Sequence, residues 1–211
     1  MFYAYRHLTP EEREEVMQQR RARGYPLHSP PHPLRGPGQY LITTANYEHQ
    51  HVMADPGRRT DFEARLLEKL RENEVETYAW AVLSNHYHAL VGVKILDDVS
   101  AALKSLHGAT SREWNLADGV TGKRQTWYHF SDRKIRGDEH FHRAMNYIHY
   151  NPVKHGYTKS VYDWPWSSVH NYLSAHGRDW LRETWKNFRP DSMGEGWDDY
   201  VLDQNDAPMQ T

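Results

Sequence analysis

A chain of 211 residues can form one compact domain with extensions, but it is short for two full domains. The absence of cysteine excludes disulfides, thiolate metal sites and a cysteine nucleophile. No apolar run approaches the roughly 20 residues needed to span a bilayer, and the first residues lack the apolar core of a signal peptide. We therefore expect a soluble protein that stays in the cytoplasm.

The net charge of −2 argues against a nucleic-acid-binding protein, but the charges are unevenly distributed. Residues 101–161 hold ten lysines and arginines against five acidic residues, a balance of +5. Residues 39–100 hold six against ten and residues 178–211 hold four against eight, each a balance of −4. A basic middle between acidic parts is typical of a local phosphate-binding face. A mixed, solvated surface would explain the charges equally well.

Residues 1–38 are predicted to form a helix followed by an arm. Thr9 is a suitable helix cap, Pro10 suits the first turn, and the two glutamates that follow favour the positive end of the helix dipole. The helix should end at about Arg23. The residues after it are rich in proline and glycine, which predicts an extended arm that contains Arg35.

From residue 39 to residue 175, strand and helix patterns alternate in one domain. Period-two alternation and turn residues predict strands, and apolar residues three and four apart predict helices. The predicted elements are a strand at 40–45, a helix at 61–73, strands at 75–83 and 86–93, a helix at about 97–116, a strand or irregular segment at 125–135 and a helix at 138–150. Pro152 should end this helix, because the residue before a proline avoids the helical region. The order is the split βαβ arrangement on an antiparallel sheet, an α+β fold.

The last part of the chain carries weaker signals. A short helix at about 169–175 should follow an aromatic turn at 162–168. Residues 176–211 are acidic and lack periodicity, which predicts a loosely packed tail.

The clearest chemical pattern is His86-Tyr87-His88 in a predicted strand. Residues i and i+2 of a strand point to one face and lie about 6.6–7 Å apart along the backbone. Two imidazoles placed in this way can converge on one metal ion, while Tyr87 points into the opposite layer. Because the chain has fifteen histidines, a pair that only forms hydrogen bonds at the sheet surface is the alternative. Asn85, directly before the pair, suits the hairpin turn and is interpreted as structural.

Tyr147 lies in the helix predicted at 138–150, and Asn151 directly follows that helix. Because the two residues are four apart, they share a helix face. The asparagine could offer its side-chain oxygen to a hard divalent cation. The tyrosine could act as a nucleophile, since phenolic oxygens form covalent intermediates. A half-buried packing tyrosine is the usual alternative. Tyr150 is a rival nucleophile, but it lies about 300° round the helix from Tyr147.

Aromatic and basic residues are interleaved in the segment that begins at Trp127. The rings of Trp127 and Tyr128 could stack on bases, and the side chains of Arg133, Lys134 and Arg136 could hold phosphates. A twisted strand with a solvated edge is the alternative.

Taken together, these segments resemble the REP-associated tyrosine transposases, within the HUH single-tyrosine transposase superfamily. The matching stretches are Leu83 to Val91, Leu103 to Leu106, Trp127 to Arg136, Tyr147 to Gly156 and Trp164 to Ser168. They cover about residues 39–175. The specific feature is the ordered combination of the histidine pair, the Tyr147 segment and the Trp-Pro-Trp-Ser-Ser segment.

The resemblance implies an RRM-like or ferredoxin-like antiparallel sheet with helices on one face. It implies that His86 and His88 bind a divalent metal, Mg²⁺ or Mn²⁺, that Asn151 completes this site, and that Tyr147 is the nucleophile. Related insertion-sequence transposases carry a glutamine at the position of Asn151. The implied reaction is cleavage and transfer of single-stranded DNA through a 5′-phosphotyrosine.

The implied substrate is single-stranded DNA with hairpins of repetitive extragenic palindromes. The residues expected to contact this DNA are Arg35, Lys104, Arg112, Trp127, Tyr128, Arg133, Lys134, Arg136 and Lys154. We expect a monomer, in the cytoplasm and associated with the nucleoid. Two alternatives remain open: a metal-dependent phosphoesterase that uses water, and a non-catalytic regulator that binds hairpin DNA.

Overall fold

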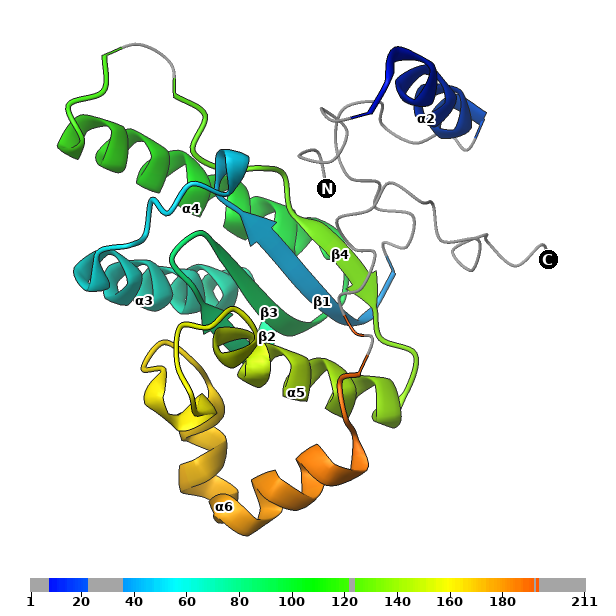
Figure 1. The fold of residues 1–211 in the computed structure, drawn as a ribbon, viewed down its shortest axis with the longest axis vertical. Helices are drawn as coiled ribbons and strands as arrows, with labels where there is room; N and C mark the ends of the chain where they lie inside the picture. The colour runs from blue at the N-terminus through cyan, green and yellow to red at the C-terminus, as the bar shows by residue number, and fades with distance from the viewer. Residues whose placement is uncertain (1–7, 23–35, 122–123, 192, 194–211) are drawn as a thin grey trace. The chain divides into compact units, whose positions relative to one another are not determined.

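The computed structural model describes residues 8–22, 36–121, 124–191 and 193, and the chain divides into two units (Figure 1). One unit comprises residues 1–31 and 192–211, and its described helix is α2 (Pro10–Ala22). The backbone N–H of Thr9 donates to Glu12 Oε2 at 2.7 Å, and that of Glu12 donates to Thr9 Oγ1 at 3.2 Å. This reciprocal cap confirms the predicted helix start.

The other unit, residues 32–191, is built on a four-stranded antiparallel sheet. Its strands are β1 (Gly38–Ala45), β2 (Glu76–Val82), β3 (His86–Val93) and β4 (Ser131–Lys134). They lie in the order β2-β3-β1-β4, so the first and third strands occupy the centre. This is the strand order of the split βαβ unit, which confirms the predicted α+β fold.

Helices α3 (Pro56–Glu72) and α4 (Leu96–Ala117) cover one face of the sheet. The main apolar core lies between them and the strands, and it includes Tyr40, Ile42, Phe62, Leu66, Leu70, Tyr87, Ala89, Val91, Val99, Leu103 and Leu106. Helix α3 begins five residues before the predicted start. The reason is a cap that the apolar pattern does not reveal: Asp55 Oδ2 accepts from the N–H of Arg58 at 2.8 Å, with proline in the first turn.

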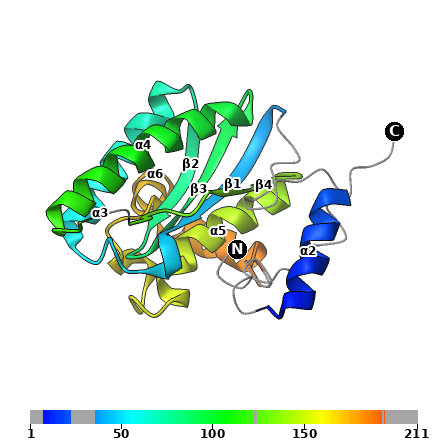
Figure 2. The ribbon, with the colours of Figure 1, turned by 90° about the horizontal axis from the view of Figure 1, so that it is seen from above.

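Helix α5 (Asp138–Lys154) covers the opposite face, so helices lie on both sides of the sheet (Figure 2). The two helices of the split βαβ unit share one face as predicted, and α5 is an addition to them. Its position follows from the strands, because Leu41 and Leu90 alternate with the core residues Tyr40 and Val91 and are as deeply buried. Because both faces of the sheet carry buried apolar side chains, each face must be covered by helices.

The prediction that Pro152 ends α5 is wrong, since the helix continues to Lys154. Proline removes only one hydrogen bond here, in the last turn. The N–H of His155 still donates to the carbonyl of Asn151 at 3.0 Å. Pro152 and Asn151 are both buried, so packing against the sheet overrides the local preference of the residue before proline.

Helix α6 (Val169–Asn187) extends twelve residues beyond the predicted end at 175. It bends at Gly177, whose φ of 81° suits glycine. Its second half is packed, because Leu181 is buried and Asn146 Nδ2 donates to the carbonyls of Thr184 at 3.1 Å and Phe188 at 2.8 Å. Residues 178–188 therefore belong to a packed helix and its cap, not to a loose tail.

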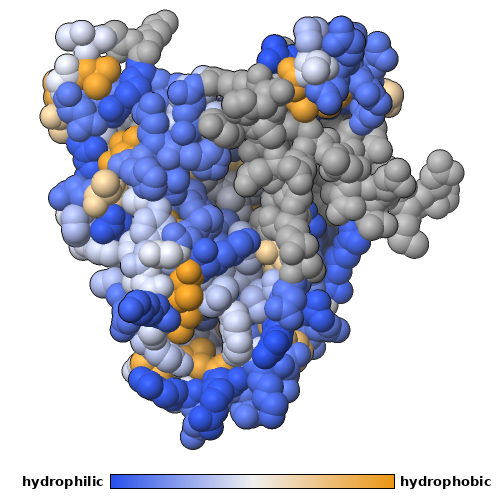
Figure 3. All heavy atoms as spheres, in the orientation of Figure 1, coloured by the Kyte–Doolittle hydropathy of each residue, from blue (hydrophilic) through white to orange (hydrophobic). Residues whose placement is uncertain are grey.

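The face of this unit that Figure 3 shows is mainly polar where it is coloured. Hydrophilic residues dominate the part of the face formed by α5 and α6, and hydrophobic residues appear in small, separate patches (Figure 3). Within the described ranges, no helix combines the length and the apolar character needed to cross a membrane.

Asn146→Ala should lower the free energy of unfolding by about 1–3 kcal/mol, because the buried carbonyls at the end of α6 lose their side-chain donor. Amide hydrogen exchange in the second half of α6 should also accelerate. The matched variant Asn171→Ala, at an exposed position of the same helix, should change stability by less than about 0.5 kcal/mol. Equal effects of both substitutions in chemical denaturation would contradict this packing.

Candidate active site

His86 and His88 lie side by side on the face of the sheet that α5 covers. Their ring centroids are 5.1 Å apart with an interplanar angle of 79°. They are 9% and 2% exposed. Tyr87, between them, points to the other face and packs against Phe62 and Trp127. The alternation of β3 thus separates the two imidazoles from the main apolar core.

Each imidazole is held through its Nδ1 atom. His86 Nδ1 lies 2.7 Å from Asn85 Oδ1, and His88 Nδ1 lies 2.8 Å from Thr43 Oγ1 on the neighbouring strand β1. On the other side of the rings, His86 Nε2 lies 3.0 Å from Asn151 Oδ1. Within the described part of the chain, the buried atoms His88 Nε2 and Asn151 Nδ2 have no hydrogen-bond partner.

Helix α5 brings Tyr147 to the same cluster. Its ring centroid is 5.1 Å from that of His88, and the residue is 6% exposed. Asn151 follows one turn later and is fully buried. Lys154 Nζ lies 5.3 Å from the Tyr147 ring centroid. Asn151 follows Tyr147 by four residues and Lys154 follows Asn151 by three, so all three share the helix face that meets the histidines.

His155 is a member of this cluster that the sequence analysis did not single out. Its ring centroid is 4.9 Å from that of His86. The available signal was its spacing, because His155 comes four residues after Asn151 and thus falls on the same helix face. The prediction that the helix ends before Pro152 removed that signal.

Burial lowers the pKa of His88 well below its usual value. Positive charge on His86, His155 and Lys154 acts in the same direction, and a contact with the carboxamide of Asn151 opposes it. A lowered pKa favours the neutral imidazole at neutral pH. The neutral ring is the form that can offer a lone pair to a metal ion.

The candidate donors could hold a divalent cation if Asn151 takes part, since its carboxamide supplies the oxygen that Mg²⁺ and Mn²⁺ prefer beside the imidazoles. Among the residues that the structure describes, no group of three or more histidine, cysteine or carboxylate side chains is arranged to hold a metal. The candidate donors are therefore two imidazoles and one carboxamide oxygen. Two ligand atoms about 2.1 Å from an octahedral ion lie about 3.0 Å apart when they are adjacent, and this is the separation of His86 Nε2 and Asn151 Oδ1. The unpartnered His88 Nε2 provides a further donor.

The basic residues predicted to contact DNA fall on different faces. Arg133 pairs with Leu41 in the sheet and so shares the histidine face, where Lys154 also lies. Lys134 pairs with Tyr40, and its Nζ lies 5.8 Å from the centroid of that ring on the other face. Lys104 and Arg112 are exposed on α4, which covers the other face of the sheet, and Arg136 is exposed just before α5. Arg35 lies outside the described residues.

Trp127 and Tyr128 are buried, which differs from the expected base-stacking role. The Trp127 ring is stacked between Phe62 and His107, with centroid distances of 5.1 Å and 4.5 Å. Its Nε1 donates to Thr110 Oγ1 at 3.1 Å. Because neighbours cover both faces of the indole, Trp127 packs the core in this structure. Tyr128 packs against Tyr47 with a centroid distance of 5.0 Å.

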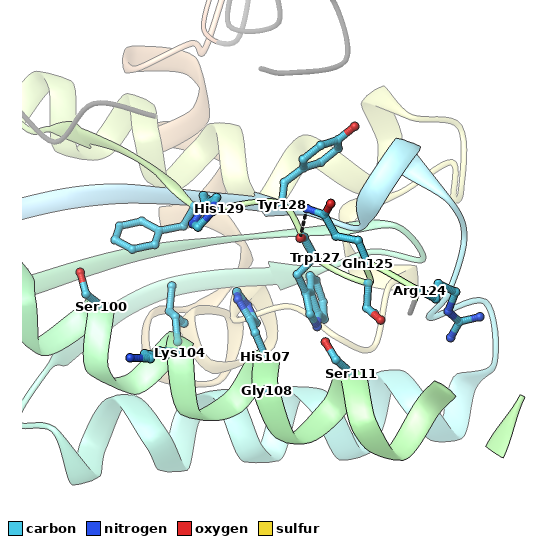
Figure 4. A pocket seen from close by; sticks show the side chains of 13 residues that line it. Ser100, Lys104, His107, Gly108, Ser111, Arg124, Gln125, Trp127, Tyr128 and His129 are labelled. Carbon is cyan, nitrogen blue, oxygen red and sulfur yellow. Dashed lines mark hydrogen bonds between the residues drawn. The ribbon is translucent and has the colours of Figure 1, made fainter. Parts of the chain in front are cut away.

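A pocket of about 550 Å³ lies between α4 and residues 124–130. In Figure 4, His107 and Ser111 extend from α4 toward the segment that carries Gln125 and Trp127. His107 Nε2 lies 2.9 Å from the hydroxyl of Tyr87. The pocket is thus on the side of the sheet opposite to His86, and it is distinct from the histidine cluster.

Comparison with known proteins finds two curated relatives and a similar solved structure. No family model matches the chain. The chain is 32% identical over 121 residues to a Haemophilus influenzae protein named "Putative REP-associated tyrosine transposase", covering 50% of this chain and 66% of the relative. It is also 32% identical over 101 residues to the Escherichia coli REP-associated tyrosine transposase, covering 47% and 58%. The matched part of the chain therefore covers less than two thirds of the length of each curated relative.

A solved structure of a REP-associated tyrosine transposase bound to a REP hairpin matches with a TM-score of 0.55 and 24% identity. The match covers 69% of this chain and 84% of that one, so the two proteins share a fold. These findings confirm the resemblance read from the sequence: the chain has homologues among the REP-associated tyrosine transposases and is folded like one of them.

Proposed function

We propose that this protein is a metal-dependent single-stranded DNA endonuclease and strand transferase that acts on hairpins of repetitive extragenic palindromes through Tyr147. The observation that carries the proposal is the meeting of one phenol with two imidazoles and a carboxamide on one face of the sheet. The substrate class is supported by the similar structure, whose protein is bound to a REP hairpin.

The reaction requires a nucleophile, a leaving group and neutralisation of charge on the phosphate. His86, His88 and Asn151 would hold Mg²⁺ or Mn²⁺, which would supply Lewis-acid polarisation of the scissile phosphate. The hydroxyl oxygen of Tyr147 attacks phosphorus, and its proton passes to solvent. A Tyr147 oxygen–phosphorus bond forms while the bond from phosphorus to the 3′ oxygen breaks. The products are a 5′-phosphotyrosine and a free 3′-hydroxyl, which takes up a proton.

Strand transfer is the reverse of this step with a different strand. A 3′-hydroxyl attacks the phosphotyrosine, the phosphodiester is restored, and Tyr147 leaves as a phenol. The ammonium group of Lys154, near the Tyr147 ring, favours negative charge on both the phenolic oxygen and the phosphate. Arg133, on the same face of the sheet, is suited to hold a neighbouring phosphate.

Tyr147→Phe should abolish both cleavage and the covalent adduct, because phenylalanine lacks the attacking oxygen, while hairpin binding stays near that of the wild type. The matched control is Tyr150→Phe, since Tyr150 is 36% exposed and packs on Trp185. The measurement is an SDS-stable, protease-sensitive attachment of a labelled hairpin oligonucleotide in the presence of Mn²⁺. An adduct with the Tyr147 variant rules out this nucleophile. Cleavage without any adduct would identify a water-using phosphoesterase, and binding without cleavage a regulator.

Asn151→Ala should raise the Mn²⁺ concentration needed for half-maximal cleavage by about tenfold or more, because one oxygen donor is lost. Asn151→Asp keeps an oxygen at the same position and adds charge, so this variant should need no more Mn²⁺ than the wild type. Titration of cleavage with Mn²⁺ at fixed DNA measures both. If the aspartate variant is as impaired as the alanine variant, Asn151 only packs.

Lys154→Met should slow cleavage by about tenfold or more, because a cation beside the reacting groups stabilises charge that develops in the transition state. Lys104→Met, on the exposed surface of α4, should leave single-turnover cleavage within about twofold of wild type at saturating DNA, since an electrostatic contact remote from the reaction affects binding rather than chemistry. Single-turnover rates at saturating DNA distinguish the two. Equal rates for both variants would contradict a role of Lys154 in the reaction.

A further inference from the structure

Asn85 uses both ends of its side chain at the turn before His86. Its Nδ2 donates to the carbonyl of His49 at 3.1 Å, and its Oδ1 lies 2.7 Å from His86 Nδ1. Its backbone carbonyl accepts from the N–H of Asn46 at 2.7 Å. The contact with His49 fixes which end of the carboxamide faces the imidazole, because only the amide nitrogen can donate to a carbonyl.

The loop that supplies this carbonyl adopts an unfavourable backbone conformation. Glu48 and His49 have φ angles of 55° and 52°, in the left-handed region that non-glycine residues rarely adopt. The loop is tied to the hairpin turn, since the N–H of Met53 donates to the carbonyl of Ser84 at 2.9 Å and His51 Nδ1 lies 2.5 Å from Ser84 Oγ. Such strain persists only where surrounding contacts hold it, and it clusters at functional sites.

The fixed orientation of Asn85 determines the tautomer of His86. An amide oxygen can only accept, so His86 Nδ1 must carry the hydrogen. In the neutral ring, Nε2 then carries a lone pair that faces Asn151 Oδ1 at 3.0 Å. Two acceptors at this distance repel each other, and a cation that both can ligate removes the repulsion.

We propose that Asn85 is a positioning residue that holds His86 as the Nδ1–H tautomer, so that the ring presents its Nε2 lone pair to a divalent cation. The hydroxyl of Thr43 faces Nδ1 of His88, where it can accept or donate, and Nε2 of that ring has no partner among the described residues. The inference rests on the proposed metal-dependent function and adds to it the residue that selects the ligand atom of His86.

The first test reads the tautomer in the metal-free, full-length protein. Histidines labelled with ¹⁵N are followed in long-range ¹H–¹⁵N correlation spectra, and His86 is assigned with a His86→Gln variant. The wild type should show hydrogen on Nδ1, and Asn85→Ala should shift the population toward the Nε2–H form. Asn85→Asp keeps an acceptor for Nδ1 and should keep the wild-type tautomer. An Nε2–H form of His86 in the wild type would overturn the proposal.

The second test measures Mn²⁺ binding without DNA by electron paramagnetic resonance. Asn85→Ala should weaken Mn²⁺ binding about 10- to 100-fold, as is usual when the partner of a ligating histidine is removed, and metal-independent hairpin binding should stay unchanged. Wild-type Mn²⁺ affinity in Asn85→Ala would overturn the proposal.

Asn73→Ala is the matched control, since Asn73 Nδ2 also donates to a carbonyl, that of Lys69 at 2.8 Å, at the end of α3. It should change neither the tautomer nor the affinity for Mn²⁺. His49→Gly keeps the carbonyl and suits the left-handed backbone, so it should keep both as well. Loss of the tautomer in His49→Gly would contradict the role given to that carbonyl. If Tyr147 is not the nucleophile, only the adduct assay with Tyr147→Phe would show it. Neither the tautomer of His86 nor Mn²⁺ binding depends on the hydroxyl of Tyr147.

Discussion

The candidate site depends on one constraint, the alternation of side chains along β3 in a sheet that is covered on both faces. Tyr87 must enter the apolar core under α3 and α4, and this sends His86 and His88 to the face under α5. A slip of one residue in the pairing with β1 would exchange the two sets and bury both imidazoles in the apolar core. The register, in which Thr43 pairs with His88, therefore fixes both the packing of the core and the position of the candidate site.

The face under α5 gives up some stability for this arrangement. His88 and Asn151 are 2% and 0% exposed, yet each has a buried polar atom without a partner in the described part of the chain. Leaving such an atom unpaired costs about 1–3 kcal/mol. The main core on the other face carries the fold with packed aromatic and aliphatic side chains such as Phe62 and Trp127. The division lets one face tolerate unsatisfied groups that suit the binding of a cation.

Sequence reasoning located most of the sheet because its signals are local. The Ser84-Asn85 turn and the alternation after it gave the bounds of β3, and the spacing of Tyr147 and Asn151 gave their shared helix face. The failures involve contacts between segments far apart in the chain. The continuation of α5 past Pro152 and the stacking of Trp127 on Phe62 are decided by packing, which neither propensity nor periodicity records. Arg35 falls outside the described residues, so its predicted DNA contact stays a prediction.

Asn85 illustrates how a turn residue acquires a second role. The sequence supports only its suitability for a hairpin turn, and the structure adds contacts to a strained carbonyl in a distant loop and to the adjacent imidazole. The same side chain therefore closes the turn and sets the hydrogen of His86. Because one carboxamide makes both contacts, the loop at 46–53 is linked to the histidine pair through Asn85. The positive φ angles of Glu48 and His49 occur in the same loop that presents this carbonyl to Asn85, so the loop conformation and the orientation of the His86 ring share one set of contacts.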